Sequence, residues 1–207
     1  MVARRVVPFG EEAIALSCAG PEEARALAAA VSRIPGVLEA VPGYEQVVAH
    51  LVSAREQPGL LTRLTEVEPV TIDEATTRAH EVRVIYDGPD LVEVAHVVGL
   101  TPREVADVHA GSELVVEVIG FLPGFAYLGG LDPRLARPRR PTPRPRVPAG
   151  TVAIAGLRSA IYPLDSPGGW NLIGHAVDFA AFDPTRAPPS VFAVGDRVRF
   201  VVEDVRC

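Results

Sequence analysis

The most distinctive stretch of the chain is GFLPGFAYLGGLDPRL, residues 120–135. Glycine and proline turns separate short apolar segments there, and similar segments lie at 114–119, 151–155, 160–162, 170–173 and 197–202. Short strands joined by glycine and proline turns are typical of a β-barrel or a β-sandwich. This part of the chain is therefore predicted to consist mainly of strands and turns.

The segment just before this stretch is predicted to contain one strand and two helices. The strand is expected at 82–86, and the first helix over 89–98 with Gly99 at its end. The second helix begins at TPRE, residues 101–104, where the threonine and the glutamate have the spacing of a capping box, and it ends at Gly111.

The first third of the chain alternates between strands and helices. Strands are predicted at 14–18, 37–41 and 46–52, a helix from Gly20-Pro21 to residue 34, and a short helix over 60–67. This pattern indicates a small α+β unit, which we expect to be ferredoxin-like. The acid- and threonine-rich stretch 66–79 marks a boundary, so the sequence predicts two domains, residues 1–75 and 76–207.

Cysteine usage and the N-terminus favour a cytoplasmic protein. Cys18 and Cys207 lie at opposite ends of the 207-residue chain and form neither a disulfide framework nor a metal-ligand spacing. The first residues lack the apolar segment of a signal peptide, and no apolar run is long enough to span a membrane. We therefore expect no membrane association.

Charge is distributed unevenly along the chain. The net charge is −6, but residues 133–164 contain no acid and hold seven arginines: Arg134, Arg137, Arg139, Arg140, Arg144, Arg146 and Arg158. An isolated basic strip on an acidic protein favours a small anion over a nucleic acid lattice. The chain has no lysine, which excludes a P-loop lysine and a Schiff-base lysine from it.

Three of these arginines are candidate ligand contacts. Arg139, Arg140 and Arg144 suit a phosphate or a carboxylate, because a guanidinium can bind two oxygens at once. A solvated loop and a contact with an acidic partner surface are the alternatives.

Aromatic and glycine residues supply the other candidates. Gly168 and Gly169 would let a ligand approach the flat face of Trp170, although Trp170 in the core is an equal alternative. Tyr127 and Tyr162 have polar tips and fit a pocket wall. The phenylalanines at 121 and 125 are instead predicted to belong to the core of the barrel.

The five histidines do not have the spacing of a metal site. His175 follows Gly174 at the end of a glycine-rich block and is the one histidine expected near a pocket. Ser166, His175 and Asp178 do not make a catalytic triad, because the chain has no G-x-S-x-G motif around the serine. The sequence identifies no catalytic residue and no metal site.

Several unusual blocks occur in one order after residue 120: PRR at 138–140, VPAG at 147–150, IYP at 161–163, SPGGW at 166–170 and LIG at 172–174. Together they resemble the family that includes the 5-oxoprolinase B subunit, allophanate hydrolase subunit 1 and a sporulation-kinase inhibitor. The resemblance covers about residues 80–202 and implies a cyclophilin-like β-barrel. The chain departs from the family pattern at RSA, 158–160, and at HAV, 175–177.

The resemblance also implies a function. It points to the small B subunit of a bacterial ATP-dependent 5-oxoprolinase, which converts 5-oxoproline to glutamate together with a larger C subunit and an A subunit. ATP, bound with magnesium, would be shared with these partners, and the chain alone would be inactive. The alternatives are the carboxyltransferase (allophanate hydrolase subunit 1) role in urea breakdown and a regulatory inhibitor of a histidine kinase.

Overall fold

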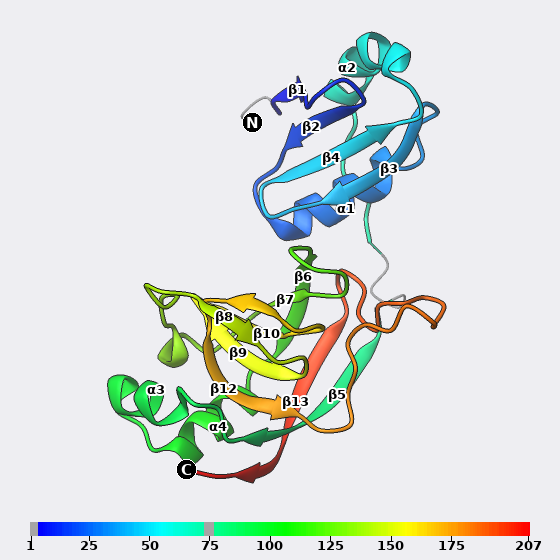
Figure 1. Ribbon diagram of the computed structural model, residues 1–207. Coiled ribbons are helices and arrows are strands. Elements are labelled where there is room, and N and C mark those ends of the chain that lie inside the picture. Colours follow the sequence, from blue (N-terminus) through cyan, green and yellow to red (C-terminus); the bar gives the residue numbers. More distant parts are fainter. Residues whose placement is uncertain (1–3, 73–76) are drawn as a thin grey trace. The chain divides into compact units, whose positions relative to one another are not determined.

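The protein is described by a computed structural model that covers residues 4–72 and 77–207. Its backbone divides into two compact units, Met1–Thr76 and Thr77–Cys207 (Figure 1). In the part of the chain that the structure describes, no helix has the length and apolar character needed to cross a membrane.

The first unit is a four-stranded antiparallel sheet with helices. Its strands lie in the order β1-β2-β4-β3. The elements along the chain are β1 (Val6–Pro8), β2 (Ala13–Ser17), α1 (Pro21–Val31), β3 (Val37–Pro42), β4 (Gln46–Leu51), a 3-10 turn η1 (Ala54–Glu56) and α2 (Gln57–Thr65). Apolar residues of both helices and of the sheet form one core, with Ile14, Leu27, Val47 and Leu60 at most 1% exposed.

The predicted strands and helices of this unit are present, but their order is not that of a ferredoxin-like unit. A ferredoxin-like unit runs β-α-β-β-α-β. Here the strand β1 precedes β2 and pairs with it, so the order is β-β-α-β-β-α. The ferredoxin-like prediction is therefore not confirmed.

The second unit is a closed seven-stranded barrel, which confirms the predicted β-barrel. The strands follow each other around it in the order β10-β7-β6-β13-β5-β12-β9. Their bounds are β5 (Ala79–Tyr86), β6 (Leu114–Ile119), β7 (Ala126–Gly129), β9 (Thr151–Ala155), β10 (Arg158–Ile161), β12 (Asn171–Ala176) and β13 (Arg197–Val205). A separate antiparallel ribbon is made by β8 (Arg144–Val147) and β11 (Ser166–Gly168), and a 3-10 turn η3 covers Pro133–Leu135.

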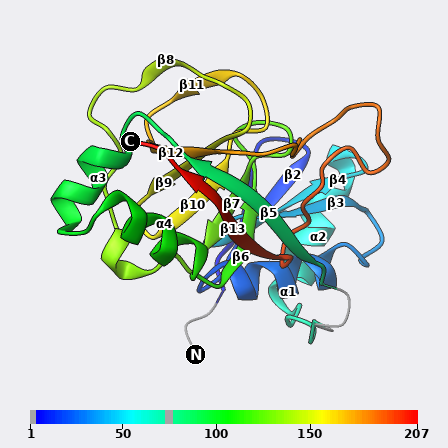
Figure 2. The same ribbon diagram turned by 90° about the horizontal axis from the view of Figure 1, so that it is seen from below.

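Two helices close one side of the barrel (Figure 2). Helix α3 (Leu91–Val98) packs against β12, and α4 (Pro102–Ala110) packs against β13. The predicted capping box is present at the start of α4, where the Thr101 hydroxyl accepts a hydrogen bond from the Glu104 amide and the Glu104 carboxylate accepts one from the Thr101 amide.

Side chains fill the interior of the barrel, including one polar group of three. His109 of α4 is fully buried, with Nδ1 2.7 Å from the Tyr86 hydroxyl and Nε2 2.8 Å from the Ser159 hydroxyl. Burial lowers the pKa of His109 to about 3, so the imidazole is neutral at physiological pH. A filled interior leaves the outer surface as the place for a ligand site.

Candidate functional site

Strands β9 and β10 bury both of their faces. Along β9, Val152 and Ile154 point into the barrel core, whereas Ala153 and Ala155 belong to a second apolar cluster. This is the alternation that a strand imposes on its side chains. The small alanines leave room over the outer face, and larger rings, including those of Phe125 and Trp170, fill it.

A pocket of about 290 Å³ opens within this second cluster. We call it the aromatic pocket, and its lining residues are Phe121, Phe125, Tyr127, Arg139, Pro143, Tyr162, Pro167, Gly168, Gly169 and Trp170. The rings meet edge to face, with centroids 5.8 Å apart for Phe125 and Trp170 and 5.8 Å for Tyr127 and Trp170. The structure thus brings together six of the residues that the sequence predicted as ligand contacts.

The two glycines of the pocket differ in how much space they need. A Cβ atom on Gly168 would lie 2.2 Å from the Tyr162 hydroxyl, so only glycine permits the present position of that ring. A Cβ atom on Gly169 would be no closer than 3.7 Å to any neighbour outside the adjoining residues. Gly168 therefore shapes the pocket because it has no side chain and leaves space for the Tyr162 ring. Gly169 instead contributes its backbone carbonyl, which accepts a hydrogen bond from the Arg140 amide at 2.7 Å.

Arg139 is the charged residue of the pocket lining. Its guanidinium carbon lies 5.9 Å from the centre of the Trp170 ring, in cation–π range. Within residues 4–72 and 77–207, no carboxylate forms an ion pair with Arg139. The side chain therefore keeps its hydrogen-bonding capacity for a ligand.

Tyr162 lies beside this cation and is only 1% exposed. Burial raises the pKa of Tyr162, while a backbone hydrogen bond at Trp170 and the charges of Arg139 and Arg144 oppose that rise. The phenol is therefore protonated at neutral pH and can donate a hydrogen bond.

Arg140 and Arg144 lie outside the pocket lining, in a partly buried ionic group around the buried Asp90 that we call the Asp90 junction. The Asp90 carboxylate, 3% exposed, accepts hydrogen bonds from Arg144 Nη2 at 2.6 Å, Arg140 Nη1 at 3.0 Å and the Leu172 amide at 2.7 Å. Arg140 Nη1 also lies 3.1 Å from Glu93. One donor of this group, Arg144 Nη1, is buried and has no partner in the described part of the chain.

His175 is also outside the pocket lining. Its Nδ1 lies 2.8 Å from an oxygen of Asp87, and its position on β12 is opposite Ile85 of β5. Asp178 pairs with Arg83 at 3.3 Å, so Ser166, His175 and Asp178 do not form a triad. This agrees with the rejection of the triad from the sequence.

Phe121 lines the pocket, although its sequence context predicted a position in the core. Phe125 is buried in the apolar cluster, but Phe121 is 62% exposed at the edge of the pocket, so the prediction of a core position is wrong for Phe121. The physical reason is the turn before β7, where Phe121 has a positive φ of 75° and points outward. A left-handed phenylalanine is uncommon and gives no signal in the sequence.

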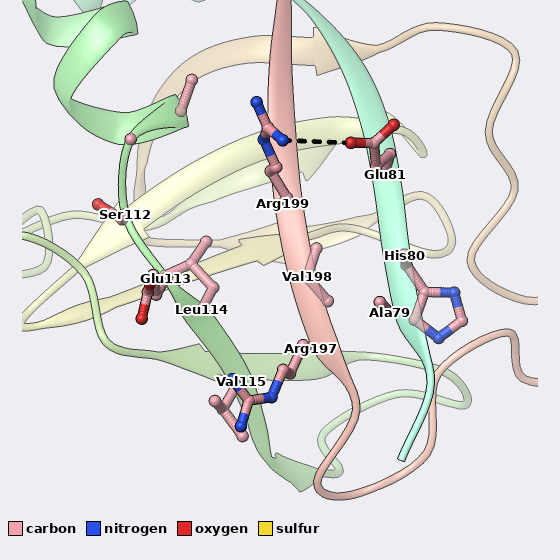
Figure 3. A pocket seen from close by; sticks show the side chains of 12 residues that line it. Ala79, His80, Glu81, Ser112, Glu113, Leu114, Val115, Arg197, Val198 and Arg199 are labelled. Carbon is pink, nitrogen blue, oxygen red and sulfur yellow. Dashed lines mark hydrogen bonds and ion pairs between the residues drawn. The ribbon is translucent and has the colours of Figure 1, made fainter. Parts of the chain in front are cut away.

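A larger groove of about 670 Å³ is lined by the first residues of β5, β6 and β13 and by the end of α4 (Figure 3). Glu81 of β5 and Arg199 of β13 point toward each other from neighbouring strands, with 3.5 Å between their charged groups. Its lining has no tyrosine, phenylalanine or tryptophan, and its charges are of both signs. Among the residues that the structure covers, no group of three or more His, Cys, Asp or Glu side chains could hold a metal ion.

Comparison with known proteins gives a consistent result. A family model described as the carboxyltransferase domain, subdomain C and D, matches residues 4–192. The chain is 38% identical to the 5-oxoprolinase B subunit of Bacillus subtilis, over 95% of this chain and 88% of that protein. The protein of the same name from Haemophilus influenzae is 36% identical, over 97% of this chain and 98% of its own length.

Comparison with solved structures shows which known folds this chain resembles. The crystal structure of TTHA0988 superimposes with a TM-score of 0.81 at 40% identity, over 92% of this chain, which spans only 39% of that longer chain. PH0987 from Pyrococcus horikoshii has a TM-score of 0.59 at 34% identity, over 97% of this chain and 98% of its own. The urea amidolyase of Kluyveromyces lactis has a TM-score of 0.74 over 97% of this chain and 15% of its own, but at 16% identity this likeness concerns the fold alone.

Proposed function

The chain belongs to the carboxyltransferase-domain family that includes the 5-oxoprolinase B subunit, and we propose that it is the small B subunit of a bacterial ATP-dependent 5-oxoprolinase. Such an enzyme opens the lactam of 5-oxoproline to give glutamate. The observation that carries the proposal is that three relatives sharing most of this chain have this one name. We further propose a small domain over 1–75, a cyclophilin-like barrel domain over 76–207 and a cytoplasmic location.

We also propose that the chain is inactive alone and works with a larger C subunit and an A subunit. The aromatic pocket offers one guanidinium and two phenols, and its lining contains no carboxylate or imidazole that could act as a general base. These groups can bind and orient a substrate and keep water from it. The remaining catalytic groups would come from the partners.

The pocket does not fit magnesium-bound ATP. Magnesium prefers oxygen ligands, usually one or two carboxylates with phosphates and water, and no carboxylate lines the pocket. A volume of about 290 Å³ is also at the lower limit of ligand pockets, which suits a small molecule better than a nucleotide. We therefore place ATP in a part of the assembly that the partner subunits line.

The chemical role of the chain then lies in positioning. A lactam is a poor electrophile, so holding its ring in one orientation against the reacting groups of the partners lowers the barrier. The rings of Phe125, Tyr127 and Trp170 shape such a site, and Arg139 with Tyr162 supplies fixed donors at one end.

The experiment measures ATP-dependent release of glutamate from 5-oxoproline by the purified chain, by the chain with its C subunit, and by all three subunits. We expect turnover for the complete set and none for the isolated chain. Turnover by the isolated chain at the rate of the assembly would contradict the subunit role. No turnover by the complete set, with each subunit folded, would contradict the proposed reaction.

A further inference from the structure

The walls of the aromatic pocket suit a small ring-shaped molecule. Three aromatic side chains meet edge to face there, and Pro143 and Pro167 line the same space. Such surfaces lose water readily and pack against the faces of a flat or slightly puckered ring. A ring with one small substituent fits within the volume of about 290 Å³.

The polar groups of the pocket suit a single negative charge. Arg139 lies over Trp170 and has no ion pair with a carboxylate of the described chain, so it brings one uncompensated positive charge to the lining. Tyr162 adds a protonated hydroxyl to the same lining. A guanidinium with a neighbouring donor is well matched to the two oxygens of a carboxylate.

A second cation stands behind these donors. Asp90 holds Arg144 through Nη2 and leaves Nη1 buried without a partner among the described residues. Arg144 lies opposite Gly168 of the pocket lining in the ribbon of β8 and β11, so its backbone adjoins the pocket. Its guanidinium does not line the pocket, so we assign the contact with a ligand carboxylate to Arg139.

We propose that the aromatic pocket binds the substrate of the reaction as a small cyclic amide acid, with its ring against Trp170 and its carboxylate on Arg139. This inference rests on the proposed function and adds to it that this chain, not its partners, recognises the carboxylate of 5-oxoproline. The lactam amide then lies away from Arg139, toward the mouth of the pocket at Phe121, where partner groups can reach it.

Trp170 makes a direct test possible because it is the one tryptophan of the chain. Its fluorescence is followed while 5-oxoproline, 2-pyrrolidinone or magnesium-ATP is added to the complex of this chain with a C subunit in which any tryptophans are replaced by phenylalanine. The neutral lactam 2-pyrrolidinone has the same ring without the carboxylate. We expect 5-oxoproline to change the emission saturably and 2-pyrrolidinone to bind at least roughly tenfold more weakly, because it cannot use the charge-assisted contact.

The matched variants are Arg139→Ala and Arg146→Ala. Arg146 belongs to the same basic strip, but its side chain is 77% exposed and pairs with Asp165 outside the pocket. Arg139→Ala should weaken 5-oxoproline binding by roughly tenfold to a hundredfold, the usual loss for a charged hydrogen bond, and should remove the preference over 2-pyrrolidinone. Arg146→Ala should leave both affinities unchanged.

Two results would overturn the inference. One is an Arg139→Ala complex that is folded and binds 5-oxoproline as tightly as the unchanged complex. The other is a saturable response to magnesium-ATP that competes with 5-oxoproline at this pocket. If glutamate is still released and only these binding results fail, the proposed function stands and the site is elsewhere. If 5-oxoproline binds as expected but the complete assembly releases no glutamate, the pocket stands and the proposed reaction is wrong.

Discussion

The aromatic pocket and the Asp90 junction are built from the same basic strip, yet they use their arginines in opposite ways. Arg139 and Arg140 are consecutive in the chain, and the side chain of the first lines the pocket while that of the second pairs with Asp90 and Glu93. In the pocket, no carboxylate of the described chain pairs with Arg139, so its positive charge is available to a ligand. At the junction, the charge of Arg140 is balanced by Asp90 and Glu93. A run of arginines therefore does not by itself locate an anion site.

The difference has a physical origin in the position of the carboxylates. Asp90 and Glu93 lie at the start of α3, some 50 residues before Arg140. The junction ties α3 to β12 as well, since the Asp90 amide donates a hydrogen bond to the Leu172 carbonyl in addition to the side-chain contact. It is therefore a structural element of the barrel wall.

Asp90→Ala should lower the free energy of unfolding by about 3 kcal/mol, because three donors would lose a buried charged acceptor. Two guanidiniums and the Leu172 amide would lose their acceptor. Chemical denaturation of the purified chain measures the loss. The matched control is Asp165→Ala, which removes an exposed partner of Arg146 and of the Ala149 amide and should cost clearly less. Equal losses in the two variants would contradict a structural role for the junction.

In the barrel interior, three neutral polar side chains form hydrogen bonds with one another and no charged group takes part. These side chains belong to Tyr86, His109 and Ser159. The pKa of His109 is lowered by burial to about 3, whereas an unfolded histidine titrates near 6.5. As the pH falls from about 6.5 toward 3, the unfolded chain binds a proton that the folded chain does not. The stability of the fold must therefore decrease over this range, by about 1.4 kcal/mol per pH unit from this group.

Denaturation midpoints at several pH values test this expectation by comparison with His109→Gln, which keeps two hydrogen-bonding atoms but cannot be protonated. The loss of stability between pH 6.5 and 4.5 should be smaller in the variant by roughly 2–3 kcal/mol. Parallel pH profiles for the two proteins would show that the imidazole is not buried in its neutral form.

The sequence predicts those parts of the fold and of the candidate site in which residues that contact each other are also close together in the chain. The barrel and the capping box at Thr101 follow from local patterns, and so do the turn residues Gly168 and Trp170 that line the pocket. The partners of Arg140 and His175 could not be found in this way. Asp90 and Asp87 meet them only because β5, α3 and β12 lie together in the folded barrel.

The two glycines of the pocket give a paired test of its shape. Gly168→Ala should lower the free energy of unfolding by about 1–3 kcal/mol, because the new methyl group would overlap the Tyr162 hydroxyl. Gly169→Ala should change it by less than about 0.5 kcal/mol, since a methyl group there finds only ordinary contacts. Thermal unfolding of the two variants in parallel checks the pair. Similar melting temperatures would mean that Tyr162 can move aside and does not shape the pocket.

The finest test of the contrast between neighbouring arginines is a pair of double-mutant cycles on Asp90. Asp90→Asn combined with Arg140→Ala should be measurably less destabilising than the sum of the two single changes, because the two side chains share a part-buried contact at 3.0 Å. Asp90→Asn combined with Arg139→Ala should be additive within about 0.3–0.5 kcal/mol, since Arg139 lies against Trp170 and has no contact with Asp90. Urea denaturation of the four variants of each cycle supplies the numbers. Equal coupling in both cycles would place the two arginines in one electrostatic group, and Arg139 would then no longer be a cation reserved for a ligand.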